Sequence, residues 1–180
     1  MSDDRDRWND RYRENTPSEE AATIVREHAD ELPGGTALDL ACGGGRNAIF
    51  LAERGLDVTG VDVSDEALAH ARRRADDAGA DVDFLRADAN EMDLEPEAYD
   101  VVVVTYFRTR ERLPDLLDAL APGGLLLYEH RLETGEDRRF RVRTNELLHA
   151  CLDLRIVRYE EPVDVTPDDC TVRLVARRQR

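Results

Sequence analysis

The sequence predicts an α/β fold with a doubly wound, mostly parallel sheet, helices on both faces and an antiparallel strand near the C-terminus. Between residues 36 and 131, apolar runs rich in β-branched residues alternate with helical segments. A glycine-rich turn, Gly43–Gly45, joins the first of these runs to a helix. After residue 131, two segments of alternating polar and apolar residues follow one another, and such neighbours favour an antiparallel pair.

The N-terminal region is expected to be helical. A helix over residues 3–14 would carry Trp8 and Tyr12 four positions apart on one face. A second helix is expected from Thr16-Pro17-Ser18-Glu19 to about Asp30. In that stretch Thr16 has the character of an N-cap, proline stands at the first helical position and glutamate completes a capping box.

The central elements follow from periodicity and from helix-end signals. Ser64 is a suitable N-cap, while Gly55 and Gly79 are placed to end helices in the left-handed conformation. A run of four valines, 101–104, is typical of a central parallel strand because it is apolar on both faces. The expected strands are 36–41, 57–61, 82–86, 99–105, 125–129, 154–159 and 171–177, and the expected helices are 46–54, 65–78, 113–120 and 145–151.

The length of 180 residues fits one domain with a substantial core. Within it we expect an N-terminal helical cap over residues 1–33, a ligand-binding core over 36–131, and a C-terminal helix with an antiparallel strand pair over 132–180.

The composition is strongly acidic, with a net charge of −15, and all 25 basic residues are arginine. An acidic surface without lysine resembles proteins adapted to high salt, where ions screen self-repulsion. A GC-rich genome that favours arginine, alanine and aspartate codons is the alternative. The charge argues against a nucleic-acid partner, although this argument weakens in molar salt.

The three cysteines are odd in number and fit no metal-binding spacing, so we expect free thiols in a cytoplasmic protein and no metal site. The N-terminus has no apolar stretch typical of a signal peptide. The longest apolar runs are too short to span a bilayer.

Three carboxylates stand at the ends of successive predicted strands. Asp39 comes just before the glycine turn, Asp62 ends the second strand, and Asp88 follows the third. Because the carboxyl ends of parallel strands meet at one edge of a sheet, these acids should surround one site. Asp62 is placed to hold the two hydroxyls of a ribose, so the pattern predicts a nucleotide-like ligand.

Four stretches of the chain are similar to motifs of one enzyme family, the class I S-adenosylmethionine-dependent methyltransferases. They are Asp39–Asn47, Val61–Ser64, Ala87–Ala89 and Leu120–Gly124. The opening Trp8-Asn9-Asp10-Arg11-Tyr12 and the closing strand pair also resemble the tellurite-resistance and thiol methyltransferase branch. The resemblance implies a seven-stranded Rossmann-like methyltransferase fold, S-adenosylmethionine as cofactor, and a small-molecule methyl acceptor such as a thiol or a chalcogen oxyanion.

Each part of that cofactor has a suitable partner. Asp39 would face the ammonium, Asp62 the ribose hydroxyls, and Asp88 the adenine amino group. An arginine would bind the carboxylate and an aromatic ring would cover the sulfonium. The expected cofactor-binding residues are Trp8, Arg11, Tyr12, Asp39, Ala41, Gly43, Gly45, Arg46, Asp62, Val63, Asp88, Ala89 and Thr105.

The acceptor should bind beyond the fourth and fifth strands. A thiolate needs no general base, whereas an alcohol or phenol usually does, and no catalytic residue is assigned. His130 and Tyr106 are the candidates for a base, since histidine titrates near neutrality and Tyr106 follows the fourth strand. The residues expected around the acceptor are Tyr106, Phe107, Arg108, Glu129, His130, Arg131 and Arg141.

Several alternatives stay open. Gly43-x-Gly45-x-x-Ala48 also matches a relaxed NAD fingerprint, but Asp39, Asp88 and the antiparallel tail disfavour a dinucleotide. A cofactor-binding protein of the same fold without transfer activity is a second alternative. A polyamine synthase-like enzyme is disfavoured because no acidic pair follows the fourth strand. The protein is expected to be a monomer or a homodimer.

Overall fold

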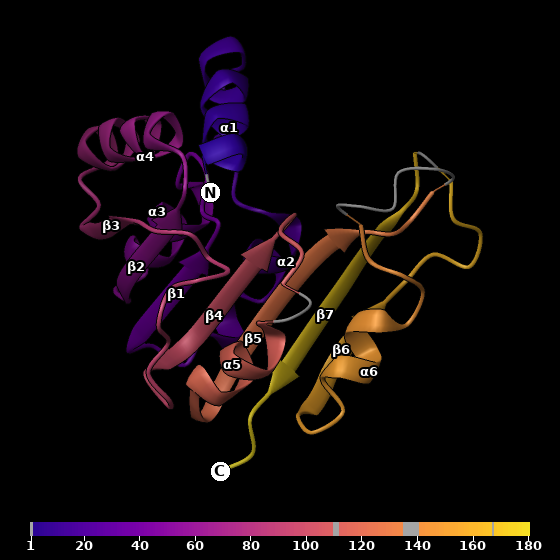
Figure 1. Ribbon diagram of the computed structural model, residues 1–180. Coiled ribbons are helices and arrows are strands. Elements are labelled where there is room, and N and C mark those ends of the chain that lie inside the picture. The colour runs from indigo at the N-terminus through magenta and orange to yellow at the C-terminus, as the bar shows by residue number, and fades with distance from the viewer. Residues whose placement is uncertain (1, 110–111, 135–140, 167) are drawn as a thin grey trace.

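A computed structural model of the protein describes residues 2–109, 112–134, 141–166 and 168–180. Its centre is a seven-stranded sheet in the order β3-β2-β1-β4-β5-β7-β6 (Figure 1). The strands are β1 (Thr36–Leu40), β2 (Asp57–Asp62), β3 (Val82–Arg86), β4 (Tyr99–Thr105), β5 (Leu120–Arg131), β6 (Arg155–Glu160) and β7 (Thr171–Arg177). β7 pairs antiparallel with β5 and β6, and the other strand pairs are parallel, so the predicted doubly wound, mostly parallel α/β fold is confirmed.

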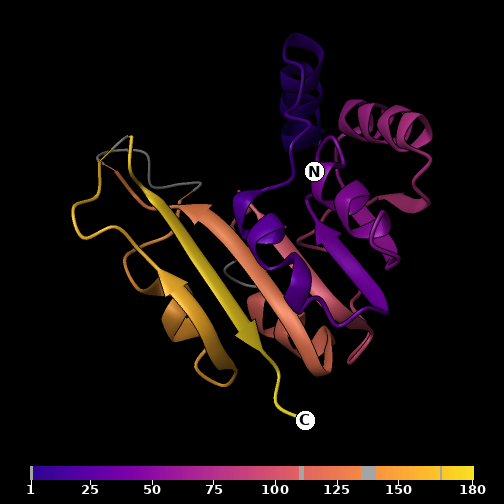
Figure 2. The same ribbon diagram turned by 180° about the vertical axis from the view of Figure 1, so that it is seen from behind.

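Helices cover both faces of this sheet. They are α1 (Ser2–Glu14), α2 (Thr23–Glu27), a 3-10 turn η1 (Ala29–Glu31), α3 (Arg46–Ala52), α4 (Asp65–Ala78), α5 (Leu113–Ala119) and α6 (Glu146–Ala150). In Figure 1, α5 and α6 lie in front of the sheet, and the reverse view in Figure 2 brings α2 to the front. Val101 and Val103 pack on the α2–α4 side, while Val102 and Val104 pack on the α5–α6 side, as expected for a strand buried on both faces.

The helix predicted from Thr16 is wrong, because residues 15–22 are not helical and α2 begins only at Thr23. Side chains from α3 and α4 hold this segment in a non-helical conformation. Arg74 Nη1 donates to the Ser18 carbonyl (3.1 Å), and Arg46 Nη1 donates to the Glu20 carbonyl (3.2 Å). These tertiary contacts use carbonyls that a helix would need, so they outweigh the local capping signal.

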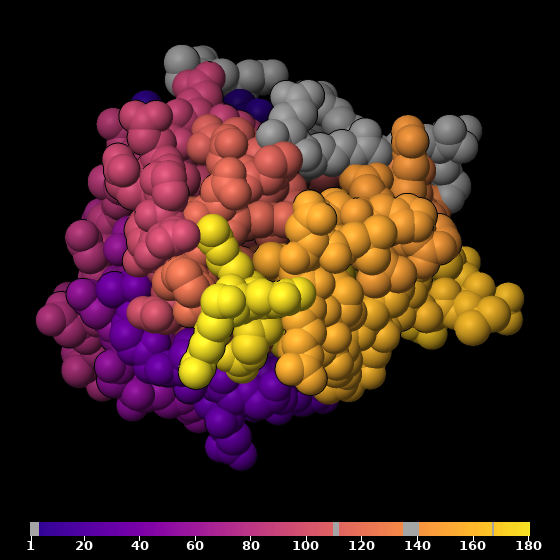
Figure 3. All heavy atoms as spheres, turned by 90° about the horizontal axis from the view of Figure 1, so that it is seen from below, coloured from indigo at the N-terminus to yellow at the C-terminus, as the bar shows by residue number. Residues whose placement is uncertain are grey.

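The segment before the fifth strand also differs from the prediction. The strand was predicted from residue 125 and the preceding helix to residue 120, yet β5 already begins at Leu120 and contains Pro122-Gly123-Gly124, with a register shift against β4. Gly123 has a φ of +85° and donates its N–H to the Arg178 carbonyl (3.0 Å). The irregularity therefore bends the strand and ties it to the C-terminal segment, which lies across this end of the molecule in Figure 3.

Helix α1 stands beside α4 at the carboxyl edge of the sheet (Figure 1). Asn9 Oδ1 accepts hydrogen bonds from Ser64 Oγ (2.8 Å) and from the Glu66 N–H (3.3 Å). Arg5 pairs with Asp65, the first residue of α4. Ser64 caps α4 as predicted, accepting from the Ala67 N–H at 3.1 Å. The contacts that hold α1 are therefore mostly polar and concentrate on the first turn of α4.

Within the described part of the chain, no helix is both long and apolar enough to cross a membrane.

Candidate functional site

Asp39 lies wholly buried at the carboxyl end of β1. Its Oδ2 accepts the Ala48 N–H of α3 (3.1 Å), whereas its Oδ1 has no hydrogen-bond partner among the described residues. Burial raises the pKa of this carboxyl to about 7, although the Ala48 N–H and the Asn47 side chain lower it in part. Asp39 is thus a buried acid with one oxygen that lacks a hydrogen-bond partner among the described residues.

Asp62 joins the glycine loop to the start of α4. Its Oδ2 accepts the Gly43 N–H (2.8 Å) and its Oδ1 accepts the Ser64 N–H (2.9 Å). Burial raises its pKa, and the hydrogen bonds from Ser64, Gly43 and Val63 lower it. The structure therefore brings Asp62, Val63 and the loop together, as the sequence predicted.

The glycine loop itself requires unusual backbone angles. Gly43 and Gly45 have φ values of +54° and +77°, and Ala41 has a φ of +56°. A Cβ at Gly45 would lie 2.8 Å from the Ala71 Cβ of α4, so this glycine is needed for close packing as well. Left-handed alanine is uncommon, and such residues concentrate at functional sites.

Of the two N-terminal aromatic residues, only Tyr12 reaches the loop. Its hydroxyl lies where a Cβ of Gly43 would stand, and burial and the Asp62 charge raise its pKa. Trp8 instead contacts two guanidinium groups of its own helix, with Arg7 at 5.5 Å and Arg11 at 5.3 Å from its ring centre. Tyr12 therefore joins the site, and Arg11 contacts Trp8 rather than the glycine loop.

A backbone hydrogen bond holds the residue before Asp88 against Asp62, since the Ala87 N–H donates to the Asp62 carbonyl (3.1 Å). Its Oδ1 accepts the Asn90 N–H (2.9 Å), which closes a turn after β3. Ala89 is buried in the core on the α5–α6 side. In this structure the Asp88 side chain supports the turn and stays partly exposed at the edge.

Asn47 is a site residue that sequence reasoning gave no role. Its Nδ2 donates to Thr105 Oγ1 of β4 (3.1 Å), and its Oδ1 accepts the Ala22 N–H (2.8 Å). It thereby fixes the N-terminal segment, α3 and the end of β4 to one another. The available signal was that Asn47 is the one uncharged polar residue on the otherwise apolar helix that follows Arg46.

The edge also holds a cluster on the same side as Asp39. Tyr106 Oη donates to Glu129 Oε1 (2.8 Å), and Arg173 Nε of β7 donates to Glu129 Oε2 (2.7 Å). The Arg46 guanidinium lies 5.8 Å from the centre of the Tyr106 ring. Because Arg46 directly follows Gly45, this cluster adjoins the glycine loop.

His130 points to the opposite face of β5 from Glu129, because neighbouring residues of a strand alternate. It stacks on Tyr128 at 6.4 Å and is 2% exposed. Burial lowers its pKa to about 4, so the ring is neutral at pH 7. The Arg131 N–H donates to its Nδ1 (2.6 Å), and its Nε2 has no hydrogen-bond partner in the part of the chain that the structure describes.

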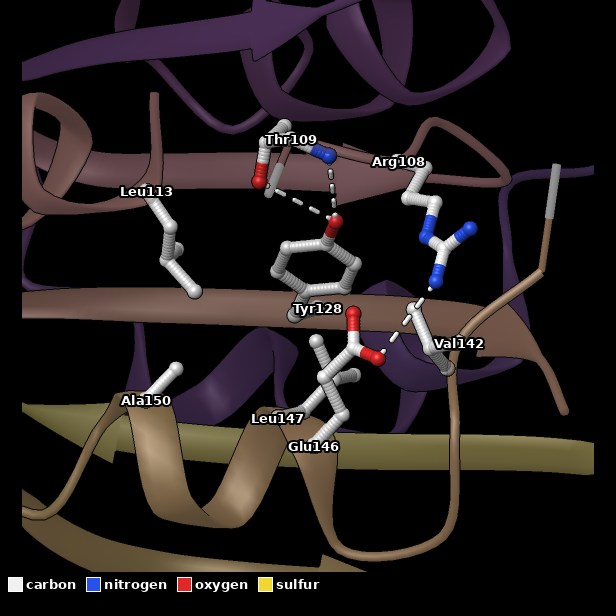
Figure 4. A pocket seen from close by; sticks show the side chains of 8 residues that line it. All are labelled: Arg108, Thr109, Leu113, Tyr128, Val142, Glu146, Leu147 and Ala150. Atoms are coloured by element: carbon white, nitrogen blue, oxygen red, sulfur yellow. Dashed lines mark hydrogen bonds and ion pairs between the residues drawn. The ribbon is translucent and has the colours of Figure 1, made fainter. Parts of the chain in front are cut away.

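A small cavity of about 60 Å³ lies on this α5–α6 side (Figure 4). Arg108 pairs there with Glu146 (3.4 Å) and Glu133 (3.6 Å). Tyr128 Oη donates to the Phe107 carbonyl (2.7 Å) and fixes the segment after β4. The lining residues are Arg108, Thr109, Leu113, Tyr128, Val142, Glu146, Leu147 and Ala150.

Arg141 does not line this cavity. Its Nη1 stabilises the segment after β5, donating to the Leu132 carbonyl (3.2 Å) and to Thr134 Oγ1 (2.9 Å). No group of three or more His, Cys, Asp or Glu side chains in the described ranges could hold a metal ion.

The central part of the chain is similar to one family of known proteins. Residues 37–124 match a family model described as a methyltransferase domain. A ubiquinone biosynthesis O-methyltransferase of Idiomarina loihiensis is 34% identical over 113 residues, which are 58% of this chain and 46% of that protein. The ubiquinone biosynthesis O-methyltransferase of Photobacterium profundum is 40% identical over 98 residues, which are 54% of this chain and 41% of that protein. The chain thus spans about half the length of these curated relatives.

Solved structures share the whole fold. TehB from Haemophilus influenzae superposes with a TM-score of 0.76 at 20% identity, covering 96% of this chain and 67% of that one. Magnesium protoporphyrin IX methyltransferase (ChlM) from Synechocystis PCC 6803, with bound SAH, superposes with a TM-score of 0.74 at 19% identity and covers 99% of both chains. At these identities the likeness shows the fold alone.

Proposed function

The chain carries a class I S-adenosylmethionine-dependent methyltransferase domain, and from this premise we propose that it transfers a methyl group from S-adenosylmethionine to a small-molecule acceptor. The observation that carries the proposal is the edge formed by Asp39, Gly43–Gly45 and Asp62. When bound, the cofactor supplies an electrophilic methyl carbon on a positively charged sulfur.

The residues present fit this cofactor. Asp39 Oδ1 is buried without a hydrogen-bond partner among the described residues, so a ligand ammonium would compensate it. Asp62 Oδ2 and Oδ1 accept the Gly43 and Ser64 N–H groups, and because a carboxylate offers about four acceptor positions, it would still accept from the ribose hydroxyls. We assign the adenine to Asp88 and the Ala89 N–H.

The remaining cofactor contacts are proposed from the same edge. Tyr12 would lie over the bound ligand, because its hydroxyl already lies against Gly43. Residues 1–33 would then act as a helical cap on a core formed by residues 36–131, while residues 132–180 complete the sheet. Of the two arginines proposed for the cofactor carboxylate, Arg46 and Arg11, Arg46 lies between the loop and Tyr106 and would bind this carboxylate.

The acceptor class and the setting remain predictions. A thiol or chalcogen acceptor follows from the narrower sequence resemblance, whereas the relatives' names favour an oxygen acceptor. We propose a cytoplasmic, salt-adapted monomer or homodimer without a nucleic-acid partner, in line with the net charge of −15. The NAD alternative gains no support from the methyltransferase family match.

Ligand-dependent unfolding tests the cofactor. S-adenosylmethionine or S-adenosylhomocysteine at 100 times its dissociation constant should stabilise the protein by about 2.7 kcal/mol, and NAD should not. Stabilisation by NAD alone would overturn the proposal. Cofactor binding without methyl transfer to any of a panel of phenols, thiols, amines and chalcogen oxyanions would favour a binding protein of the same fold.

A further inference from the structure

Tyr106 is held in an unusual position at the carboxyl end of β4. Its backbone φ is +57°, a value that residues other than glycine rarely adopt, and the residue is 45% exposed. Glu129 fixes it twice, since the Tyr106 N–H donates to the Glu129 carbonyl (2.9 Å) and Tyr106 Oη donates to Glu129 Oε1 (2.8 Å). The phenol is therefore accessible to a ligand while its proton already points at a carboxylate.

Glu129 is built for an internal role. It is 2% exposed, and its second oxygen accepts from Arg173 Nε (2.7 Å). Arg173 in turn lies 3.8 Å from Glu160 on β6. A buried carboxylate needs such compensation, and here one guanidinium supplies it at Oε2, while Oε1 accepts from Tyr106.

This pair lies on the cofactor side of the sheet. Thr105 is directly opposite Glu129 in the β4–β5 register, and Thr105 is bonded to Asn47 on α3. The Arg46 guanidinium faces the Tyr106 ring. Tyr106 thus stands next to the start of α3, whereas His130 lies on the other face of β5.

From this geometry we propose that Tyr106 is the catalytic residue that takes the proton of a hydroxyl acceptor, with Glu129 as the positioning residue that receives the phenol proton. The proposal rests on the methyl transfer proposed above and names its substrate class, an alcohol or a phenol. The acceptor O–H bond breaks and its proton goes to Tyr106 Oη, while the Tyr106 proton goes to Glu129 Oε1. The bond between acceptor oxygen and methyl carbon forms as the methyl–sulfur bond breaks, and Glu129 later returns its proton to water through Tyr106.

Charged groups from five elements, α2, α3, β5, β6 and β7, bear on the pH dependence of this pair. Burial, as the largest cause, and Glu129 raise the pKa of Tyr106, while Arg46 and Arg131 lower it. Behind Glu129 stand Arg173 and, around that arginine, Glu160 and Glu27. The phenol therefore stays protonated at neutral pH and can pass its proton only in concert with the acceptor.

The kinetic test compares Tyr106→Phe, Glu129→Gln and the wild type on catechol, 4-nitrocatechol and thiophenol. The matched control is Tyr99→Phe, at the opposite end of the same strand. We expect kcat for catechol to fall about 100-fold or more in both site variants, as for loss of a general base. The loss should shrink below about tenfold for 4-nitrocatechol and thiophenol, because these acceptors ionise readily without a base. KM for S-adenosylmethionine should stay unchanged.

A spectroscopic readout is independent of turnover. The absorbance of 4-nitrocatechol reports its ionisation, so we expect the dye bound to the S-adenosylhomocysteine-loaded wild type to ionise at lower pH than the free dye. Tyr106→Phe should abolish this shift and Tyr99→Phe should retain it. If Glu129→Gln does not fold, as judged by its melting curve, Tyr106→Phe decides the matter.

The outcomes separate the two proposals. Equal losses for catechol and 4-nitrocatechol, methylation of thiophenol alone, or an unshifted dye spectrum would each overturn the role of Tyr106 and leave methyl transfer standing. Failure to bind S-adenosylhomocysteine would overturn the proposed function itself.

Discussion

Asp39 and Asp62 are the same residue type at the ends of adjacent strands, yet their surroundings differ. Both oxygens of Asp62 accept backbone N–H groups, whereas Asp39 has one oxygen bonded and one without a partner among the described residues. Asp62 therefore shapes the loop before any ligand arrives. Asp39 is more dependent on the ligand for compensation of its charge.

Cofactor affinity should depend on the protonation of Asp39. Its pKa of about 7 in the ligand-free protein lies above the ordinary 3.8, and an ammonium ligand would favour the ionised form. The affinity for S-adenosylhomocysteine should rise up to about tenfold per pH unit below pH 7 and level off above it. Calorimetric titration from about pH 5.5 to about pH 8.5 measures this slope, and Asp39→Asn should remove it; a flat wild-type profile would contradict the assignment.

The raised pKa of Asp39 gives the stability of the ligand-free protein a pH dependence opposite to that of cofactor affinity. Because the folded pKa of Asp39 exceeds its unfolded value, its contribution to stability is complete below about pH 4 and is lost as the pH rises through about 7. Cofactor binding should offset this loss, so the stabilisation that the ligand gives should grow across the same interval.

Asp62→Ala should weaken binding of S-adenosylhomocysteine at least tenfold. The change removes the ribose acceptor and leaves the N–H groups of Gly43 and Ser64 without their carboxylate, which should also cost about 1–3 kcal/mol of folding stability. Asp57→Ala, an exposed site at the start of the same strand, is the control and should change neither quantity. Near-normal affinity in a folded Asp62→Ala protein would refute the ribose assignment.

Residues of the site differed in how far they could be predicted. Asp39, Asp62 and the glycines follow from a local strand–turn–helix pattern, so the chain sequence alone locates them. The contacts of Asn47 and the pairing of Glu129 with Arg173 join segments far apart in sequence, and nothing local encodes them. Trp8 and Arg11 were predicted at the cofactor, but a helix face gives no information on which turn reaches the loop.

At the scale of elements, α3 packs tightly against α4 and β3 through Gly45. A Cβ there would meet Ala71 at 2.8 Å and Phe84 at 3.0 Å. Gly55, which follows the same helix, has a similar φ of +82° but no neighbour within 4 Å of a Cβ. The two glycines therefore separate backbone strain from overpacking.

Replacing each glycine by alanine measures these two effects. Gly55→Ala should lower the free energy of unfolding by about 1–2 kcal/mol, from left-handed strain alone. Gly45→Ala should lower it by about 3 kcal/mol or more, because α3 must also move away from α4. Denaturant titration of both variants checks the difference, and equal losses would show that packing at Gly45 is not limiting.

Helix α1 should be the element that opens most easily. Its contacts with α4 are polar, and the exposed pair of Arg13 with Glu66 contributes little. Asn9→Ala should speed hydrogen exchange in residues 2–14 about fivefold, since about 1 kcal/mol of hydrogen bonding to Ser64 and Glu66 is lost. Asp10→Ala is the control, because Asp10 pairs with Arg13 of the same helix; equal exchange in both variants would contradict the anchoring role of Asn9.

The order and type of the elements were largely predictable because strong β-branched runs and helix caps recur along residues 36–131. Both incorrect predictions have the same physical cause, which is that contacts with distant segments outweigh a local sequence signal. At residues 15–22, arginines from α3 and α4 take the carbonyls that a helix would use. At Pro122–Gly124, pairing with β4 and the Arg178 segment extends a strand through a turn-like sequence.

The whole molecule carries 40 acidic against 25 basic residues, so its charges repel one another in dilute buffer. The melting temperature should rise between about 0.1 M and about 1 M salt, as the screening length falls from about 10 Å to about 3 Å. Sodium and potassium chloride should act alike. A melting temperature that falls with salt would contradict the proposed salt adaptation.

The reversed direction of β7 has a practical result. It brings the C-terminus to the amino ends of the parallel strands, at the bottom of Figure 1, while the carboxyl end of β4 lies at the opposite edge of the sheet. A fluorescent dye or a biosensor chip attached at Arg180 would consequently sit on the remote pole of the molecule. Ligand binding and dissociation could then be measured on immobilised protein, with the carboxyl edge of the sheet facing the solution.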